Sequence, residues 1–341
     1  MINSDLNAPR ASTSFKRLVL SFFFLLTMAG CGGEKPAPVL MSMTAAQKKF
    51  EQKCREDFDL HVITRMAGST LWIYLPVKDP IFDYEAQKEN SGEAHKKPSK
   101  FTVQYLDGNF KDGNFFFEYD IVTRKKVKAE DYGYSSSYTD NYVKAQNNLF
   151  TAISDVFFNA KPKAGEADVK FVVIVITDIK KGIETKATLS LEDFKRYMSG
   201  DLPYEEYMKR FLADTKGGQS MIGDETGSHL QYKDVALPEF LAKQIINRIN
   251  FKFTRSDFEP PDDYDKTITG IIADTARYYH FEKFSTARLH NLRLQKEFVF
   301  ERNQLAQFGD DTDFSSPKIP SQGKLIHIRF DNGEVQLNEE Q

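Results

Sequence analysis

An unbroken apolar segment of strand length constrains the fold of this chain more than any other feature. Phe171 to Ile176 reads F-V-V-I-V-I, and such a run predicts a strand that is covered on both faces. After a turn at 180–182 the chain alternates strictly from Ile183 to Ser190, with Glu184 on the polar side. This alternation is typical of a strand with two different faces. The two segments together predict an antiparallel hairpin.

Segments with the 3.6-residue apolar period of amphipathic helices accompany the predicted strands. The clearest one runs from about Asp140 to Asn159, with an apolar stripe formed by Tyr142, Ala145, Leu149, Ala152, Ile153, Val156 and Phe157. Other helices are predicted at 44–57 with Thr44 as N-cap, at 190–200, after Pro203, after Pro238 and at 263–281. Further hairpins or strands are predicted at 60–77, 101–121 and 287–302. We therefore expect an α+β fold in which antiparallel hairpins pack with amphipathic helices.

The domain organisation is predicted from loops and changes of composition. Tyr132 to Thr139, Y-G-Y-S-S-S-Y-T, is the candidate boundary between two lobes. The first is a small strand-rich lobe at 44–130, and the second is a mixed α+β lobe at 138–305. A polar, proline-broken linker at 306–323 leads to a C-terminal hairpin and tail at 324–341, where Asn332-Gly333 is a strong hairpin-turn signal.

The first thirty residues have the order of a secretory signal peptide. Arg10, Lys16 and Arg17 precede an apolar segment that is too short to span a bilayer, and small residues follow it. With Met28-Ala29-Gly30-Cys31 at its end, this segment resembles the lipobox of bacterial lipoprotein precursors, although Met28 stands where that class usually has Leu. The resemblance covers the first thirty-odd residues. It implies that residues 1–30 are a signal peptide, cut off before Cys31, and that Cys31 carries a lipid.

The resemblance also implies a location. The Gly- and Pro-rich segment 31–43 predicts an extended tether with a reach of roughly 40 Å at ~3.1 Å per residue. We expect a protein of the cell envelope whose membrane contact is the lipid on Cys31. In a host with two membranes, Gly32 resembles the class that is sorted to the periplasmic face of the outer membrane.

Charge and cysteine content limit the partners. Cleavage before Cys31 removes three of the 46 basic and one of the 49 acidic side chains, which leaves a net charge near −5. That balance gives no electrostatic reason to bind nucleic acid, and no nucleic-acid partner is predicted. With Cys31 acylated, Cys54 has no intramolecular disulfide partner. We interpret Cys54 as a small buried apolar residue rather than as a redox or dimerising thiol.

Sequence motifs for metal, nucleotide or nucleophile chemistry are absent, so no metal and no cofactor are predicted. The nearest approach to a catalytic site is Gly217 to His229, a glycine-rich loop that carries Asp224, Ser228 and His229. In one interpretation it is a hydrolytic loop with His229 as base and Ser228 near it. The preferred interpretation is a flexible loop between helices, because adjacent residues rarely form a nucleophile–base pair. Asp178, at the end of the buried strand, is either a functional or a turn-forming residue.

An aromatic pair is the remaining candidate for binding. In the strand at 70–77, Trp72 and Tyr74 share the face opposite to Leu71, Ile73 and Leu75. The pair packs beneath a helix or lines a ligand or partner surface. We expect a non-enzymatic binding, assembly or scaffolding protein whose partner is an envelope protein or polymer. The alternatives are a tethered envelope hydrolase that uses the loop at 217–229, and a small-ligand-binding lipoprotein that uses Trp72 and Tyr74.

Overall fold

The computed structural model describes residues 39–83, 100–123, 135–255, 258, 264–305, 308, 325–331 and 334–340. Within these ranges the chain is α+β, as predicted, with seven α-helices and two large mixed sheets of five and four strands. No helix in this part of the chain is long and apolar enough to cross a membrane. The predicted signal peptide, Cys31 and nearly all of the predicted linker at 306–323 lie outside the described residues.

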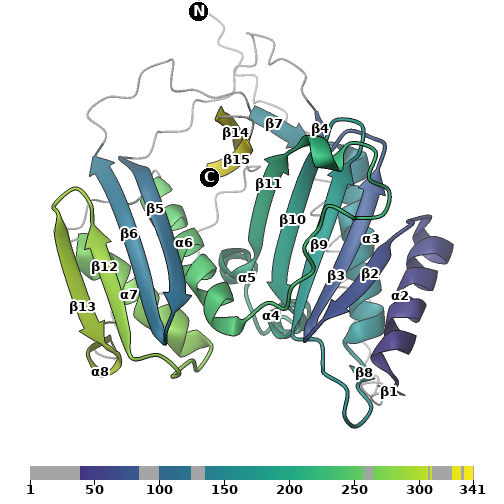
Figure 1. The fold of residues 1–341 in the computed structure, drawn as a ribbon, viewed down its shortest axis with the longest axis horizontal. Coiled ribbons are helices and arrows are strands. Elements are labelled where there is room, and N and C mark those ends of the chain that lie inside the picture. The colour runs from purple at the N-terminus through teal and green to yellow at the C-terminus, as the bar shows by residue number, and fades with distance from the viewer. Residues whose placement is uncertain are drawn as a thin grey trace, which may run out of the picture.

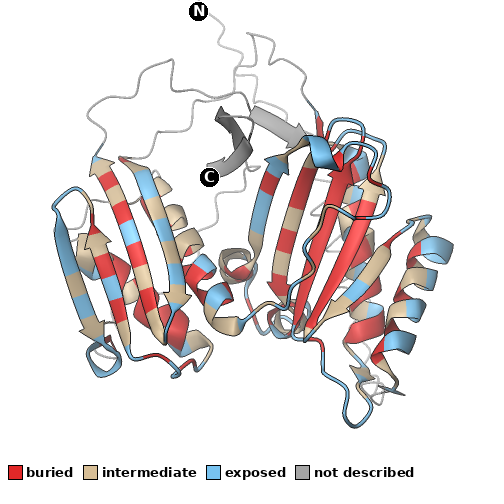
Figure 2. Cartoon of the chain, in the orientation of Figure 1, coloured by how far each residue is buried: buried red, intermediate tan, exposed pale blue. Residues whose placement is uncertain are grey.

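The larger sheet, called sheet I, has the strand order β11-β10-β9-β3-β2. Its strands are β2 (Ile63–Ala67), β3 (Thr70–Val77), β9 (Phe171–Asp178), β10 (Ile183–Ser190) and β11 (Leu212–Gly217). The predicted hairpin of β9 and β10 is confirmed, with Ile176 opposite Thr185. β9 also pairs with β3 in parallel, and every residue of β9 is buried. β9 is therefore the central strand that its apolar sequence predicts (Figures 1 and 2).

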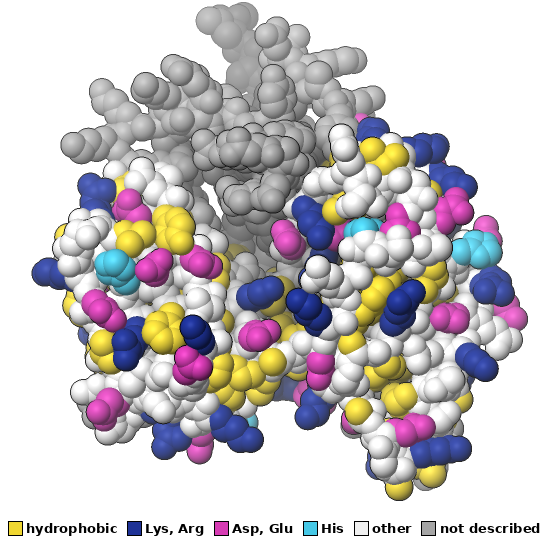
Figure 3. Space-filling model, viewed as in Figure 1, with side chains coloured by type: hydrophobic (Ala, Val, Ile, Leu, Met, Phe, Trp, Pro, Cys, Tyr) yellow, Lys and Arg dark blue, Asp and Glu magenta, His cyan; other side chains and the backbone are white. Residues whose placement is uncertain are grey.

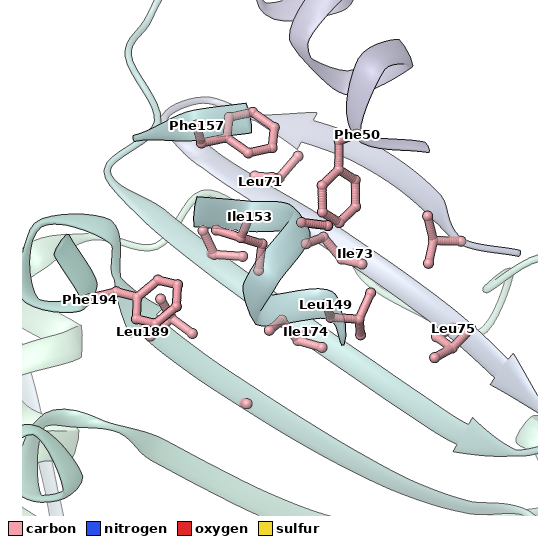
Figure 4. Close-up of a cluster of buried hydrophobic side chains, with 14 of the residues drawn as sticks. Phe50, Leu71, Ile73, Leu75, Leu149, Ile153, Phe157, Ile174, Leu189 and Phe194 are labelled. Atoms are coloured by element: carbon pink, nitrogen blue, oxygen red, sulfur yellow. The ribbon is translucent and has the colours of Figure 1, made fainter. Parts of the chain in front are cut away.

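One face of sheet I is covered by α2 (Met43–Phe58), α3 (Asp140–Phe157) and α4 (Leu191–Met198). The buried side of α3 consists of the seven residues of the predicted stripe, and Thr139 is its N-cap. Figure 4 shows how side chains from these helices meet those of the sheet, with Leu149 and Ile153 of α3 beside Ile73 and Ile174. Burial of these side chains removes apolar surface from water and is the main source of stability here.

The second large sheet, called sheet II, has the order β13-β12-β6-β5 and its own core. Its strands are β5 (Phe101–Lys111), β6 (Asn114–Thr123), β12 (Thr286–Asn291) and β13 (Lys296–Glu301). The helices α6 (Leu237–Thr254), α7 (Tyr264–Tyr278) and α8 (Arg302–Leu305) contribute to the same core. Phenylalanines of β6, β5 and the 281–284 segment pack edge to face within it, as the aromatic content of the chain favours.

Two small sheets complete the fold. β1 (Val39–Leu40) pairs in parallel with β8 (Ala160–Lys161). The other has the order β15-β14-β7-β4, formed by β4 (Phe82–Asp83), β7 (Ser135–Tyr138), β14 (Leu325–Asp331) and β15 (Glu334–Glu340). β14 and β15 are antiparallel, which confirms the predicted C-terminal hairpin. α5 (Tyr204–Arg210) lies between α4 and β11 in the chain.

The two large sheets do not follow the predicted lobes at 44–130 and 138–305. Sheet I combines β2 and β3 with β9, β10 and β11, and sheet II combines β5 and β6 with β12 and β13. The joining contacts are the parallel pairs β3–β9 and β6–β12. Parallel strands need long crossover connections, so their partners lie far apart in sequence and no local pattern reveals them.

The last residues of the predicted tether at 31–43 belong to the folded body. Beside the β1–β8 pair, the N–H of Met41 donates to the carbonyl of Lys161 at 3.0 Å. The N–H of Met43 donates to Oε2 of Glu166 at 2.8 Å. Ser42, rather than Thr44, caps α2 by accepting from the N–H of Ala45.

Candidate functional site

The predicted loop at 217–229 begins a segment that crosses the face of sheet I opposite to its helices. After β11 comes a 3-10 turn, η3 (Gln219–Met221), and then residues 223–235, which we call the strap. The strap contains no helix or strand and passes in front of β9 and β3 before it reaches α6 (Figure 1). It therefore connects a strand to a helix and packs on the sheet, unlike the flexible loop between helices that we predicted.

His229 lies in the strap between two carboxylates. Its Nδ1 is 2.6 Å from Oδ2 of Asp224, and its Nε2 is 2.6 Å from Oε2 of Glu184. The side chains of His229 and Glu184 are 5% and 0% exposed, respectively. The ring of Tyr74 meets the imidazole edge-on, with 5.8 Å between the ring centroids. This buried Glu184–His229–Asp224 group, which we call the latch, is the candidate site.

Asp224 organises the start of the strap. Its Oδ1 accepts hydrogen bonds from the N–H and the hydroxyl of Thr226, both at 2.9 Å. Its Oδ2 accepts from the N–H of His229 at 3.0 Å and from the hydroxyl of Ser228 at 3.1 Å. Burial alone would raise the pKa of Asp224, but the hydrogen bonds from His229 and Thr226 outweigh it and hold this pKa well below its usual range. Asp224 is therefore an anion at neutral pH.

Glu184 is the site residue that the sequence did not reveal. It lies in β10 opposite Thr177, on the side that alternation assigns to solvent. The strap covers that side, so Glu184 is fully buried. Besides His229, its partners are the ammonium of Lys216 at 3.3 Å and the hydroxyl of Thr177 at 3.5 Å. A glutamate on the polar side of a strand carries no signal of burial, because the covering segment is encoded forty residues further on.

The three predicted candidates Asp224, Ser228 and His229 are close together, but they do not form a catalytic triad. In a triad, one ring nitrogen of the histidine receives the proton of the nucleophile and the other faces the acid. Here each ring nitrogen of His229 faces a carboxylate oxygen. The Ser228 hydroxyl donates to Asp224 instead of to His229. The arrangement holds the strap in place and activates no nucleophile.

Trp72 and Tyr74 lie beneath the strap rather than beneath a helix. Nε1 of Trp72 donates to the carbonyl of Lys233 at 2.8 Å, and its ring meets that of Tyr232 edge-on with centroids 5.5 Å apart. The Tyr74 hydroxyl donates to the carbonyl of Asp224. Trp72 is 5% exposed and Tyr74 is fully buried. In this conformation the strap occupies the surface that we considered for a ligand.

The remaining predicted candidates have structural roles in the fold. Asp178 accepts hydrogen bonds from the N–H groups of Lys180 and Lys181, both at 3.0 Å, so it is a turn-forming residue. Cys54 is a free thiol in the core, and burial raises its pKa to about 12. Among the described residues, no group of histidine, cysteine and acidic side chains has an arrangement that could hold a metal ion.

No family model, no curated protein and no solved structure matches this chain. Its function therefore has to be inferred from its own residues.

Proposed function

We propose that this chain is a lipid-anchored protein of the bacterial cell envelope with a non-enzymatic binding, assembly or scaffolding role. The observation that carries the non-enzymatic part is the latch, in which both nitrogens of His229 face carboxylates. The residues of the loop at 217–229 that most resemble a catalytic site therefore hold the strap in place. An envelope hydrolase that uses this loop is disfavoured, because the hydroxyl of Ser228 donates to Asp224 and not to the imidazole of His229.

The anchored part of the proposal is supported by the lipobox-like Met28-Ala29-Gly30-Cys31 and by its position. Only residues 31–38 separate the end of the predicted signal peptide from the first pairing of the folded body at Val39. A lipid on Cys31 would hold this body at the membrane surface. For a host with two membranes, we propose the periplasmic face of the outer membrane.

The proposed partner is an envelope protein or polymer rather than a nucleic acid. Basic and acidic side chains are interspersed over the face shown in Figure 3. Nucleic-acid binding instead favours a continuous basic stripe or patch. The partner can be identified by affinity capture of the anchored protein from its own host, with the captured set compared between the wild type and the Cys31→Ser variant.

Metabolic labelling with a palmitate analogue tests the anchor. The wild type is expected to incorporate the label and to fractionate with membranes, and Cys31→Ser is expected to do neither. Cys54→Ser is the matched control, because it removes the other cysteine and should leave labelling unchanged. Persistent labelling of Cys31→Ser would reject the lipid site.

A fluorophosphonate probe, which acylates activated serine nucleophiles, tests the non-enzymatic part. We expect the purified protein to remain unlabelled under conditions in which a known serine hydrolase is labelled completely. Labelling that disappears in Ser228→Ala would favour the tethered hydrolase instead.

A further inference from the structure

We propose that the strap is a proton-dependent cover over the aromatic face of sheet I, and that loss of one proton from the latch releases it. The covered face consists of Trp72, Tyr74, Val173 and Val175. The strap contributes Leu230, Tyr232 and Val235 to the same cluster. The guanidinium of Arg65 lies over the ring of Tyr232, 4.5 Å from its centroid. The contact is thus an apolar cluster of modest size, with hydrogen bonds from Trp72 and Tyr74 to strap carbonyls and a polar attachment at each end of the strap.

The attachment at the C-terminal end of the strap does not depend on pH near neutrality. Oδ1 of Asp234 accepts from the N–H of Ser69 at 3.0 Å and from its hydroxyl at 3.2 Å. It also accepts from the hydroxyl of Thr70 at 2.8 Å, and the N–H of Val235 donates to that hydroxyl at 2.8 Å. Amide and hydroxyl donors of this kind keep their protons throughout the physiological range. A change of pH therefore acts on the other end.

The latch at the N-terminal end needs one proton more than a neutral imidazole carries. A neutral ring has one N–H group, whereas an imidazolium has two. Each nitrogen of His229 is 2.6 Å from a carboxylate oxygen, so both contacts are hydrogen bonds only when the group holds the additional proton. Without it, a nitrogen lone pair faces a carboxylate at hydrogen-bond distance, which is repulsive.

Glu184 is the carboxylate that suffers from this loss. Asp224 keeps four donors besides the ring, from Thr226, Ser228 and the amide of His229. Oε2 of Glu184 keeps only the hydroxyl of Thr177 at 3.5 Å. Burying a charged group without compensating hydrogen bonds is strongly unfavourable. Loss of the proton therefore destabilises the contact between Glu184 of the sheet and His229 of the strap.

The other charges around the ring set the direction of the effect. The titratable groups that face the latch come from four elements: Tyr74 of β3, Glu184 and Lys186 of β10, Lys216 of β11, and Asp224 and Tyr232 of the strap. Lys186 lies over the ring of Trp72, 5.1 Å from its centroid, so the cations in direct contact with the two carboxylates are the imidazolium and Lys216. With a neutral ring, Lys216 is the one cation among the described residues that still contacts these two carboxylates. The strap is thus held most firmly at lower pH and is released as the pH rises.

The molecule contains its own reporter of this movement. Trp72 is the only tryptophan of the chain, and it donates to the strap residue Lys233. Tyr232, which lies between the latch and Asp234, meets the indole edge-on, so release of the N-terminal end of the strap exposes this part of Trp72 to water. Acrylamide quenching of Trp72 fluorescence in the purified protein, followed from mildly acidic to mildly alkaline pH, therefore measures the open fraction.

The Glu184→Gln variant keeps the contact with His229 but removes its need for the additional proton. The amide N–H of a glutamine can donate to a neutral Nε2, while Nδ1–H still donates to Asp224. We expect quenching of the wild type to increase several-fold as the pH rises, with no change in far-UV circular dichroism. In Glu184→Gln, quenching should stay low at every pH. His290→Gln is the control, since His290 also faces a carboxylate, Glu118 at 3.4 Å, but lies on sheet II; it should keep the wild-type pH step.

Quenching of the wild type that is independent of pH would overturn the proposal, and so would an unchanged pH step in Glu184→Gln. A simultaneous loss of circular dichroism would also count against it, because the whole fold would then be opening. If Glu184→Gln does not fold, hydrogen exchange of the wild type provides the measurement. Amides of 223–235 should lose protection with rising pH relative to those of sheet II, and equal behaviour of the two regions would reject the cover.

Discussion

The hydroxyl of Tyr279 donates a hydrogen bond to Oδ2 of Asp193, and this contact joins the two hydrophobic cores. Asp193 lies in α4 on sheet I, whereas Tyr279 follows α7 behind sheet II. Arg210 binds the other oxygen of Asp193 at 2.7 Å, and Gln244 of α6 donates to the Tyr279 hydroxyl at 2.7 Å. A buried polar network therefore fixes how the two sheets are placed relative to each other.

Tyr279→Phe is expected to destabilise the protein by about 1–3 kcal/mol, because Asp193 loses a donor in a buried site. Tyr204→Phe is the matched control, since Tyr204 is 56% exposed and its hydroxyl lies at the surface. Urea denaturation measures the free energy of unfolding of both variants. Equal values for the two would mean that the network adds nothing to stability.

Asp224→Asn should weaken the strap and change the response to acid. The substitution replaces an anionic acceptor of five hydrogen bonds, which we expect to cost about 2–4 kcal/mol at neutral pH. The pKa of Asp224 is lower in the folded than in the unfolded state, so its contribution is present at neutral pH and is lost as the pH falls below about 4. Urea denaturation at about pH 7 and about pH 3 should therefore show a smaller acid loss in the variant than in the wild type.

Glu225→Gln is the control for that experiment. Its side chain is 64% exposed and pairs with Lys78 at the surface, and exposed ion pairs of this kind contribute little. We expect its unfolding free energy to follow that of the wild type at both pH values. A loss as large as that of Asp224→Asn would mean that general charge, rather than the buried carboxylate, governs the acid response.

Gly227→Ala is expected to destabilise the strap for two reasons. Gly227 has φ +70°, and an added Cβ would lie 2.5 Å from the Tyr232 hydroxyl and 3.0 Å from the Tyr74 ring. Gly165→Ala is the matched control, because Gly165 has φ +89° and no atom within 4 Å of such a Cβ. Thermal denaturation should show the backbone penalty of about 1–2 kcal/mol in both variants and a further loss only in Gly227→Ala. Equal losses would show that the strap can shift to make room.

Cys54 should be inert towards thiol reagents in the native protein. Burial raises its pKa to about 12, so the thiolate fraction is about a thousand-fold smaller than for a free cysteine. In Cys31→Ser, Cys54 is the sole thiol, and its reaction with Ellman's reagent can be followed directly. The reaction should be slow in buffer and fast in concentrated urea. Rapid reaction of the native protein would contradict the burial of Cys54 on the inner side of α2.

Local patterns predicted the elements that depend on local interactions. The apolar stripe of α3 and the hairpin of β9 and β10 follow from periodicity and turn chemistry alone. β11 was missed, because the sequence L-A-D-T-K-G has neither alternation nor β-branched residues beyond Thr215. The helix predicted after Pro203 ends at Arg210, and the edge of β10 pairs with the segment that follows, with Ala213 opposite Ala187. Tertiary pairing overrides weak propensity in such segments.

Only part of the candidate site could be predicted, because sequence patterns report local contacts and not long-range ones. Asp224, Ser228 and His229 are neighbours in sequence, so their proximity was evident. Glu184, which completes the latch, comes from a strand whose alternation indicates exposure. Its role depends on the strap folding back over sheet I, a long-range contact without a sequence signature. The residue that distinguishes a structural latch from a catalytic loop was therefore the one that only the structure could supply.

The pairing of β1 with β8 also orients the molecule if Cys31 carries a lipid. Residues 31–38, even when fully extended, span at most about 29 Å. β1 and β8 lie at the end of sheet I where β3 and β9 begin, while the latch lies near the end of β9 (Figure 1). The eight residues of β9 separate these ends by roughly 26 Å, which exceeds two Debye lengths of about 10 Å at 0.1 M salt. The latch would then respond to the pH of the open aqueous compartment, beyond the surface potential of the membrane to which the lipid attaches the protein.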